Sequence, residues 1–130
     1  MSVLGQARQL LADAVTFAGT RAGTCSKYQP EVVGGYGAWI GTVVVDRRTG
    51  AAFNRSQLTA EVVTVGPAND RPTTWAALEE DVDRNIDALE AIPGLAIQVT
   101  GTATGVALVG EDHLPAVTYT CAVSITTGSA

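Results

Sequence analysis

The stretch that most constrains the fold is residues 71–94, RPTTWAALEEDVDRNIDALEAIPG, which reads as one helix between two blocks rich in β-branched residues. Gly94 is placed to follow the helix, and Thr73 or Thr74 is placed to cap its start after a proline. Large apolar residues recur at helical spacing and predict a stripe that packs on a sheet. That stripe consists of Trp75, Leu78, Val82, Ile86 and Leu89.

The other elements are predicted from the same periodicities. A first helix with one wide apolar face is expected at residues 3–18, ended by Gly19. Residues 19–37 are rich in glycine and predict a long irregular connection. Runs of β-branched or alternating residues predict strands at 38–46, 57–65, 95–100, 106–110 and 116–125, with a short further strand at 51–56. Turn-forming residues predict a turn at 101–105 and a loop at 111–115.

These elements predict an α+β protein in which two α-helices pack on a mixed or antiparallel β-sheet, in the order α-β-α-β. The 130 residues, 46% of them hydrophobic, suit a single domain over 1–130 with one core. No apolar run approaches the roughly 20 residues that span a bilayer. The first residues also lack the basic and apolar regions of a signal peptide, so we expect synthesis in a cytoplasm and no membrane partner.

The charge is distributed unevenly along the chain. Residues 1–60 carry six bases and three acids, whereas residues 61–130 carry two bases and ten acids. This asymmetry suits copies that meet head to tail, with the basic region of one facing the acidic region of the next. The alternative is a monomer that mixes both charges over one surface.

Four acids lie beside the apolar stripe of the second helix and form what we call the acidic flank: Glu79, Asp83, Asp87 and Glu90. Like charges at this spacing destabilise an isolated helix by a few tenths of a kcal/mol per pair. The flank is therefore either a solvated face or a surface that meets a partner or DNA. An anionic wall repels phosphates and would let a duplex slide past.

No residue pattern predicts catalysis, a metal site or a bound cofactor. His113 is the only histidine and is expected on a solvated loop, which excludes a His-rich metal site. The carboxylates lie on an open helix flank, without the cleft that acid–base catalysis requires. Cys25 and Cys121 match no metal-ligand spacing and are expected to be buried, reduced thiols.

A small group of bases is predicted at the tip of a β-hairpin. It consists of Arg47, Arg48 and Arg55. Without interleaved aromatic residues, and with a net charge of −5, this group does not indicate nucleic-acid recognition. It is either a solvated hairpin tip or a contact to the acids of an adjacent subunit.

The order of the elements resembles that of the tail terminator proteins of long-tailed (siphovirus-type) bacteriophages, particularly those of actinobacterial hosts. The resemblance covers most of the chain. It is carried by the segments LGQARQLLADAV, AWIGTVVVD, QLTAEVVTV, RPTTWAALEEDVDRNIDALEAIPG and HLPAVTYTCAVSIT. The family has no catalytic residues to carry over, so the resemblance implies a structural role.

The resemblance implies a virion protein that forms a homo-hexameric ring on the finished tail tube. Such a ring ends tube polymerisation and joins the tail to the head-tail connector protein, and DNA passes through its lumen without sequence recognition. The expected partners are other copies of the chain, the tail tube protein and the connector. The expected location is the neck end of the virion tail, after assembly in the host cytoplasm.

In this setting the acidic flank would line the channel or form a contact face, and the Arg47–Arg55 hairpin would reach the adjacent subunit. Two other classes of protein stay open at the level of sequence. One is another ring-forming virion component, such as a head-closure or tail-tube protein. The other is a small cytoplasmic binding protein, which would need a pocket with converging polar groups.

Overall fold

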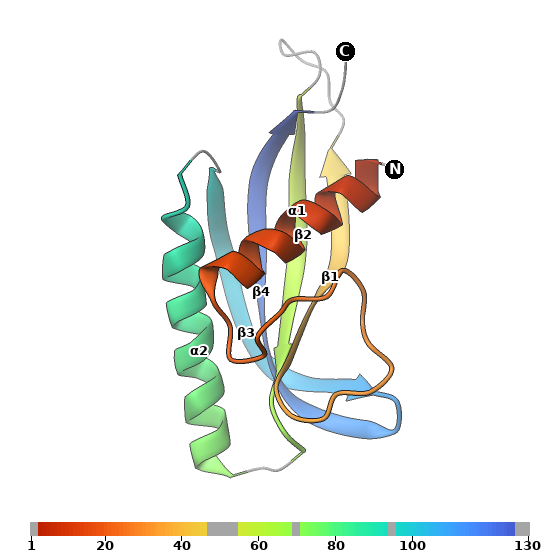
Figure 1. Cartoon of the computed structure of the whole chain (residues 1–130), viewed down its shortest axis with the longest axis vertical. Helices are drawn as coiled ribbons and strands as arrows, with labels where there is room; N and C mark the ends of the chain where they lie inside the picture. Colours follow the sequence, from red (N-terminus) through yellow and green to blue (C-terminus); the bar gives the residue numbers. More distant parts are fainter. Residues whose placement is uncertain (1–2, 47–54, 69–70, 94–95, 127–130) are drawn as a thin grey trace.

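The computed structural model describes residues 3–46, 55–68, 71–93 and 96–126. It contains the helices α1 (Val3–Ala18) and α2 (Pro72–Glu90). Its strands are β1 (Gly37–Asp46), β2 (Arg55–Val65), β3 (Ile97–Val109) and β4 (Asp112–Thr126). The strands form one sheet in the order β1-β2-β4-β3, and each neighbouring pair is antiparallel (Figure 1). The chain is thus an α+β domain with a four-stranded antiparallel sheet and two helices.

Both helices pack on the same face of the sheet. Helix α1 crosses the strands obliquely, whereas α2 runs alongside β3 (Figure 1). The alternation of β-strand side chains directs Ile40, Val62 and Tyr119 into this face, where they meet the apolar stripes of the helices. Leu11, Leu58, Leu78 and Leu89 are all fully buried there. The predicted stripe of α2 is confirmed, because Leu78, Val82 and Leu89 are buried and Trp75 and Ile86 pack against the same core.

A second apolar cluster lies on the opposite face of the sheet, which we call the outer face. It contains Trp39, Val63, Val65, Val109, Leu114 and Ala116. The end of the β3–β4 hairpin sweeps across the ends of β1 and β2 (Figure 1) and brings Val109 and Leu114 to Trp39. Trp39 is only 4% exposed and is buried by this outer-face cluster.

The C-terminal hairpin differs most from the sequence-based prediction. The turn predicted at 101–105 is wrong, because β3 runs without a break from Ile97 to Val109 and only shifts register between Val99 and Gly101. The loop predicted at 111–115 is also wrong, because β4 begins at Asp112. The actual turn is the pair that follows Val109, in which Gly110 has φ 61°. Pairing with β4 along its whole length outweighs the weak strand preference of the glycines in β3.

His113 is affected by this correction. It is exposed, as predicted, but it lies in β4 opposite Leu108 and not in a loop.

The helix boundaries agree better with the sequence. Helix α1 has the predicted bounds, and Gly19 ends it with φ 95°. Helix α2 begins earlier than predicted, because its N-cap is Arg71 and not Thr73 or Thr74. Pro72 takes the first helical position, where its fixed φ fits and its missing N–H costs nothing. Helix α2 ends at Glu90, and Gly94 lies outside the described residues.

The N-terminal half of the sheet agrees closely with prediction. Strand β1 begins one residue before the predicted 38–46, and β2 includes the predicted 57–65. Of the short strand predicted at 51–56, residues 51–54 lie outside the described residues, and Arg55 and Ser56 begin β2.

The predicted long connection at 19–37 is confirmed as irregular, and it is attached to β1. Ser26 forms a parallel bridge beside Trp39, in which its N–H donates to the Ala38 carbonyl at 2.9 Å and its carbonyl accepts from the Ile40 N–H at 3.0 Å. Arg8 of α1 donates to the carbonyls of Lys27 and Ile40, both at 2.8 Å. One end of the β1 edge is therefore covered by the chain itself.

The two cysteines are free and buried, as predicted. Burial, with a smaller contribution from Cys121, raises the pKa of Cys25 to about 12. Burial, with a smaller contribution from Glu90, also raises the pKa of Cys121 to about 12. Burial likewise raises the pKa of Tyr119 above its usual range.

These raised pKa values predict a loss of stability in alkali. The unfolded chain releases its thiol protons near pH 8.5–9, about three units below the folded chain. Stability is therefore fully present below about pH 8.5 and falls as the pH rises toward 12, by up to about 1.4 kcal/mol per pH unit for each thiol. Urea unfolding at pH 8, 9.5 and 11 measures this. A Cys25→Ala/Cys121→Ala variant should lose less stability over the same range, and an equal loss in both proteins would contradict the assignment.

Candidate contact face

The acidic flank lies beside β3 and is exposed along its length. Glu79 and Asp83 line a hollow of about 560 Å³ between α2 and the middle of β3. Val82 and Val117 form its apolar floor, and residues 102–104 of β3 form its far side. The structure therefore brings two of the four predicted acids together over one strand. Asp87, one turn further along α2, is also exposed.

Glu90 differs from the other three acids because it has a partner within the chain. Its Oε2 accepts a hydrogen bond from the Val99 N–H at 3.0 Å. This contact joins the end of α2 to the start of β3. Glu90 therefore belongs to the flank by position, but part of its hydrogen-bonding capacity is used inside the fold.

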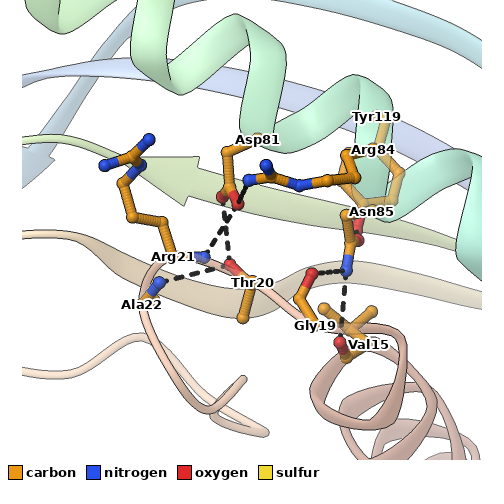
Figure 2. Close-up of polar contacts among 9 residues, drawn as sticks. All are labelled: Val15, Gly19, Thr20, Arg21, Ala22, Asp81, Arg84, Asn85 and Tyr119. Atoms are coloured by element: carbon orange, nitrogen blue, oxygen red, sulfur yellow. Dashed lines mark hydrogen bonds and ion pairs between the residues drawn. The ribbon is translucent and has the colours of Figure 1, made fainter.

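Two polar residues of α2 that were not singled out in the sequence, Asp81 and Asn85, are almost completely buried, at 1% and 2% exposed. They lie on the other side of the apolar stripe from the acidic flank, where α2 meets the end of α1 (Figure 2). Their one signal in the sequence is their four-residue spacing beside the stripe. That spacing does not distinguish a buried pair from a solvated one without knowledge of the packing partner.

Asn85 caps the C-terminal end of α1. Its Nδ2 donates to the carbonyls of Val15, at 3.2 Å, and Gly19, at 2.7 Å, and its Oδ1 accepts from the Tyr119 hydroxyl (Figure 2). The last carbonyls of a helix have no partner within the helix. Asn85 supplies a partner for the Gly19 carbonyl and a second donor for the Val15 carbonyl, which also accepts from the Gly19 N–H at 3.2 Å. It thereby links α1, α2 and β4 in one buried network.

Asp81 binds the chain immediately after α1. Its Oδ1 accepts from the Arg21 backbone N–H at 2.8 Å, and its Oδ2 accepts from the Thr20 hydroxyl at 3.3 Å (Figure 2). Arg84 lies 3.2 Å from Oδ1 and compensates the buried charge. Both residues therefore hold the fold together, and neither is placed to perform chemistry on a ligand.

The predicted basic hairpin lies mostly outside the described residues. Arg47 and Arg48 belong to the undescribed segment 47–54, and only the backbone of Arg55 is placed, as the first residue of β2. Strands β1 and β2 are antiparallel neighbours, and the prediction of a basic hairpin tip between them falls outside the described residues. Two described bases, Arg8 and Lys27, lie at the edge of β1.

A second hollow, of about 640 Å³, lies on the outer face. Its lining includes Arg8, Gln29, Trp39, Glu61 and Thr118. Within the described ranges, no three His, Cys, Asp or Glu side chains are grouped so that they could hold a metal ion.

No protein-family model matches this chain, and no curated protein matches it either. Neither described helix is long and apolar enough to cross a membrane.

Proposed function

We propose that the chain is a structural assembly protein of a bacteriophage tail. In this proposal it is a tail terminator that caps the tail tube as a homo-hexameric ring and joins it to the head-tail connector. The observation that carries the proposal is the separation of charge between the two edges of the sheet. The acidic flank lies beside β3, whereas Arg8 and Lys27 lie at the opposite edge, beside β1. Copies arranged head to tail would bring these surfaces together.

The acidic flank also supports a role beside passing DNA. Glu79, Asp83 and Asp87 are exposed, and no hydrogen-bond or ion-pair partner for them is present among the described residues. Six copies of a chain with net charge −5 would carry a total charge of about −30. Such a ring would repel phosphates and reduce adhesion of the duplex to its wall.

Reversing the flank is expected to make the protein retain DNA. A Glu79→Lys/Asp83→Lys/Asp87→Lys variant should bind duplex DNA in 50 mM salt and release it as the salt is raised, because each phosphate contact releases counterions. The wild type should not bind. A gel-shift titration at 50 and 200 mM salt measures this, and phage carrying the variant should eject DNA more slowly.

The matched control reverses three exposed acids far from α2: Glu31→Lys/Glu111→Lys/Asp112→Lys, with the same change in net charge. If both triple variants bind DNA equally, net charge explains the effect and the flank has no special role. If ejection and infectivity are unchanged by the flank variant, the channel assignment is wrong. Mass photometry of the wild type tests the ring itself, and a strictly monomeric protein at every concentration would contradict it.

A further inference from the structure

We infer that copies of this chain join edge to edge, with the open middle of β3 in one copy pairing with the open end of β1 in the next. The sheet would then continue from subunit to subunit. This inference rests on the proposed self-assembly and specifies which surfaces meet.

Apart from its pairing with β4, the backbone of β3 is hydrogen-bonded to other described segments only near its two ends. At one end the Val99 N–H donates to Glu90, and at the other the Leu108 carbonyl accepts from Gln29 Nε2 at 2.7 Å. In an antiparallel strand, the N–H and C=O of each residue point to the same side, and this side alternates along the strand. The Leu108 carbonyl points away from β4, so the backbone N–H and C=O groups of Thr104 and Val106 also point away from it. None of the described residues pairs with their outward N–H and C=O groups.

Nothing in the sequence of β3 protects this edge. The strand IQVTGTATGVALV contains no charged residue and no proline, and residues 100–106 are all exposed. Natural sheets usually block an edge strand with a lysine, a proline or a covering segment. The register shift near Val99 lies at one end and leaves the middle open. An edge of this kind is suited to strand addition.

Strand β1 offers a second open edge in the same sheet. Ser26 and Arg8 cover it at Ala38 and Ile40, but no described residue covers 42–45. That segment is also uncharged, and the Val44 side chain is 57% exposed. In the order β1-β2-β4-β3 with every pair antiparallel, β1 and β3 run in opposite directions. A second copy in the same orientation would therefore add its β1 to β3 as an antiparallel neighbour.

Charge distinguishes this pairing from the symmetric pairing of β3 with β3. Both helices lie on one face of the sheet. Pairing of β3 with β3 would therefore place two acidic flanks side by side, and their negative charges would repel each other. Pairing β3 with β1 places the flank of one copy near Arg8 and Lys27 of the next. Because it joins two different surfaces, this contact repeats from copy to copy and closes into a ring when the rotation allows it.

Cysteine cross-linking tests the pairing. Val44 and Ala103 both point to the outer face, because Val43 packs into the helix-side core and Thr102 pairs with the inward-facing Tyr119. A disulfide needs Cα atoms within about 7 Å. Mixing a Val44→Cys chain with an Ala103→Cys chain should yield oxidised dimers that neither chain forms alone. Gly101→Cys and Gly105→Cys extend the scan to the neighbouring registers. The native thiols are buried and serve as an internal control.

A proline variant gives an independent test. Thr104→Pro removes an N–H that points away from β4, a position where an edge strand tolerates proline. The circular dichroism spectrum should be unchanged, and assembly should be lost. Assembly of Thr104→Pro at the wild-type concentration would overturn the inference.

The other outcomes separate the pairing from the proposed function. Dimers of Ala103→Cys alone would indicate β3–β3 pairing and overturn the inference. Particles with the mass of a ring, but without cross-links at any scanned pair, would overturn the inference and leave the ring intact. A protein that is monomeric at every concentration and forms no cross-links would overturn both.

Discussion

Replacing Asn85 with alanine should lower the free energy of unfolding by about 3 kcal/mol, because one side chain satisfies three groups in a buried network. The variant leaves the Gly19 carbonyl and the Tyr119 hydroxyl without this partner, and it removes one of the two hydrogen bonds to the Val15 carbonyl, which keeps the one from the Gly19 N–H. A buried group left unpaired costs about 1–3 kcal/mol. Natural domains are stable by only about 5–15 kcal/mol, so the loss would be a large fraction of the total. Urea denaturation followed by circular dichroism measures it.

The control for Asn85→Ala is Asp87→Ala, an exposed position two residues further along the same helix. It should change stability by less than about 0.5 kcal/mol. Tyr119→Phe removes one bond of the network and should cost about 1–2 kcal/mol. Because the two residues share a hydrogen bond, the effects of the single variants should not add in the double variant. A loss below 1 kcal/mol for Asn85→Ala would show that water replaces the network.

Replacing Trp39 with alanine should destabilise the protein by about 3–5 kcal/mol, the usual cost of removing a large buried aromatic side chain. Trp39 fills the space between the outer face and the end of the β3–β4 hairpin, in contact with the cluster that contains Val63 and Leu114. Removing it leaves a cavity that the strands can close only in part. Chemical denaturation measures the loss, and Val44→Ala on the same strand provides an exposed control.

Hydrogen exchange distinguishes a local effect from a global one in the Trp39 variant. Amides of residues 107–114 should exchange faster in Trp39→Ala, because the hairpin end loses its main packing partner. Protection of α1, which packs on the other face, should change less. A variant that keeps full protection at the hairpin end would contradict the packing of the hairpin on the outer face.

Local periodicity was enough to predict several elements. The bounds of α1, the stripe of α2 and the alternation of β4 depend on side chains within a few residues of one another. The exposure of Glu79, Asp83 and Asp87 was predictable for the same reason, since their flank is set by the helix period alone. The burial of both cysteines also agreed with prediction.

Only the tertiary structure decided the features that depend on a distant partner. Gly101 and Gly105 read locally as a turn, but pairing with β4 keeps them within one long strand. Asp81 and Asn85 were not singled out by the sequence, but the C-terminal end of α1 lies against them and supplies the hydrogen-bond partners that make their burial favourable. Glu90 read as one more free acid, but it is bound to Val99. The sequence of residues 71–94 thus determined a helix with one apolar stripe and one acidic flank. The packing of α1 and β3 on either side of that helix decided which of its polar residues hold the fold and which remain available to a partner.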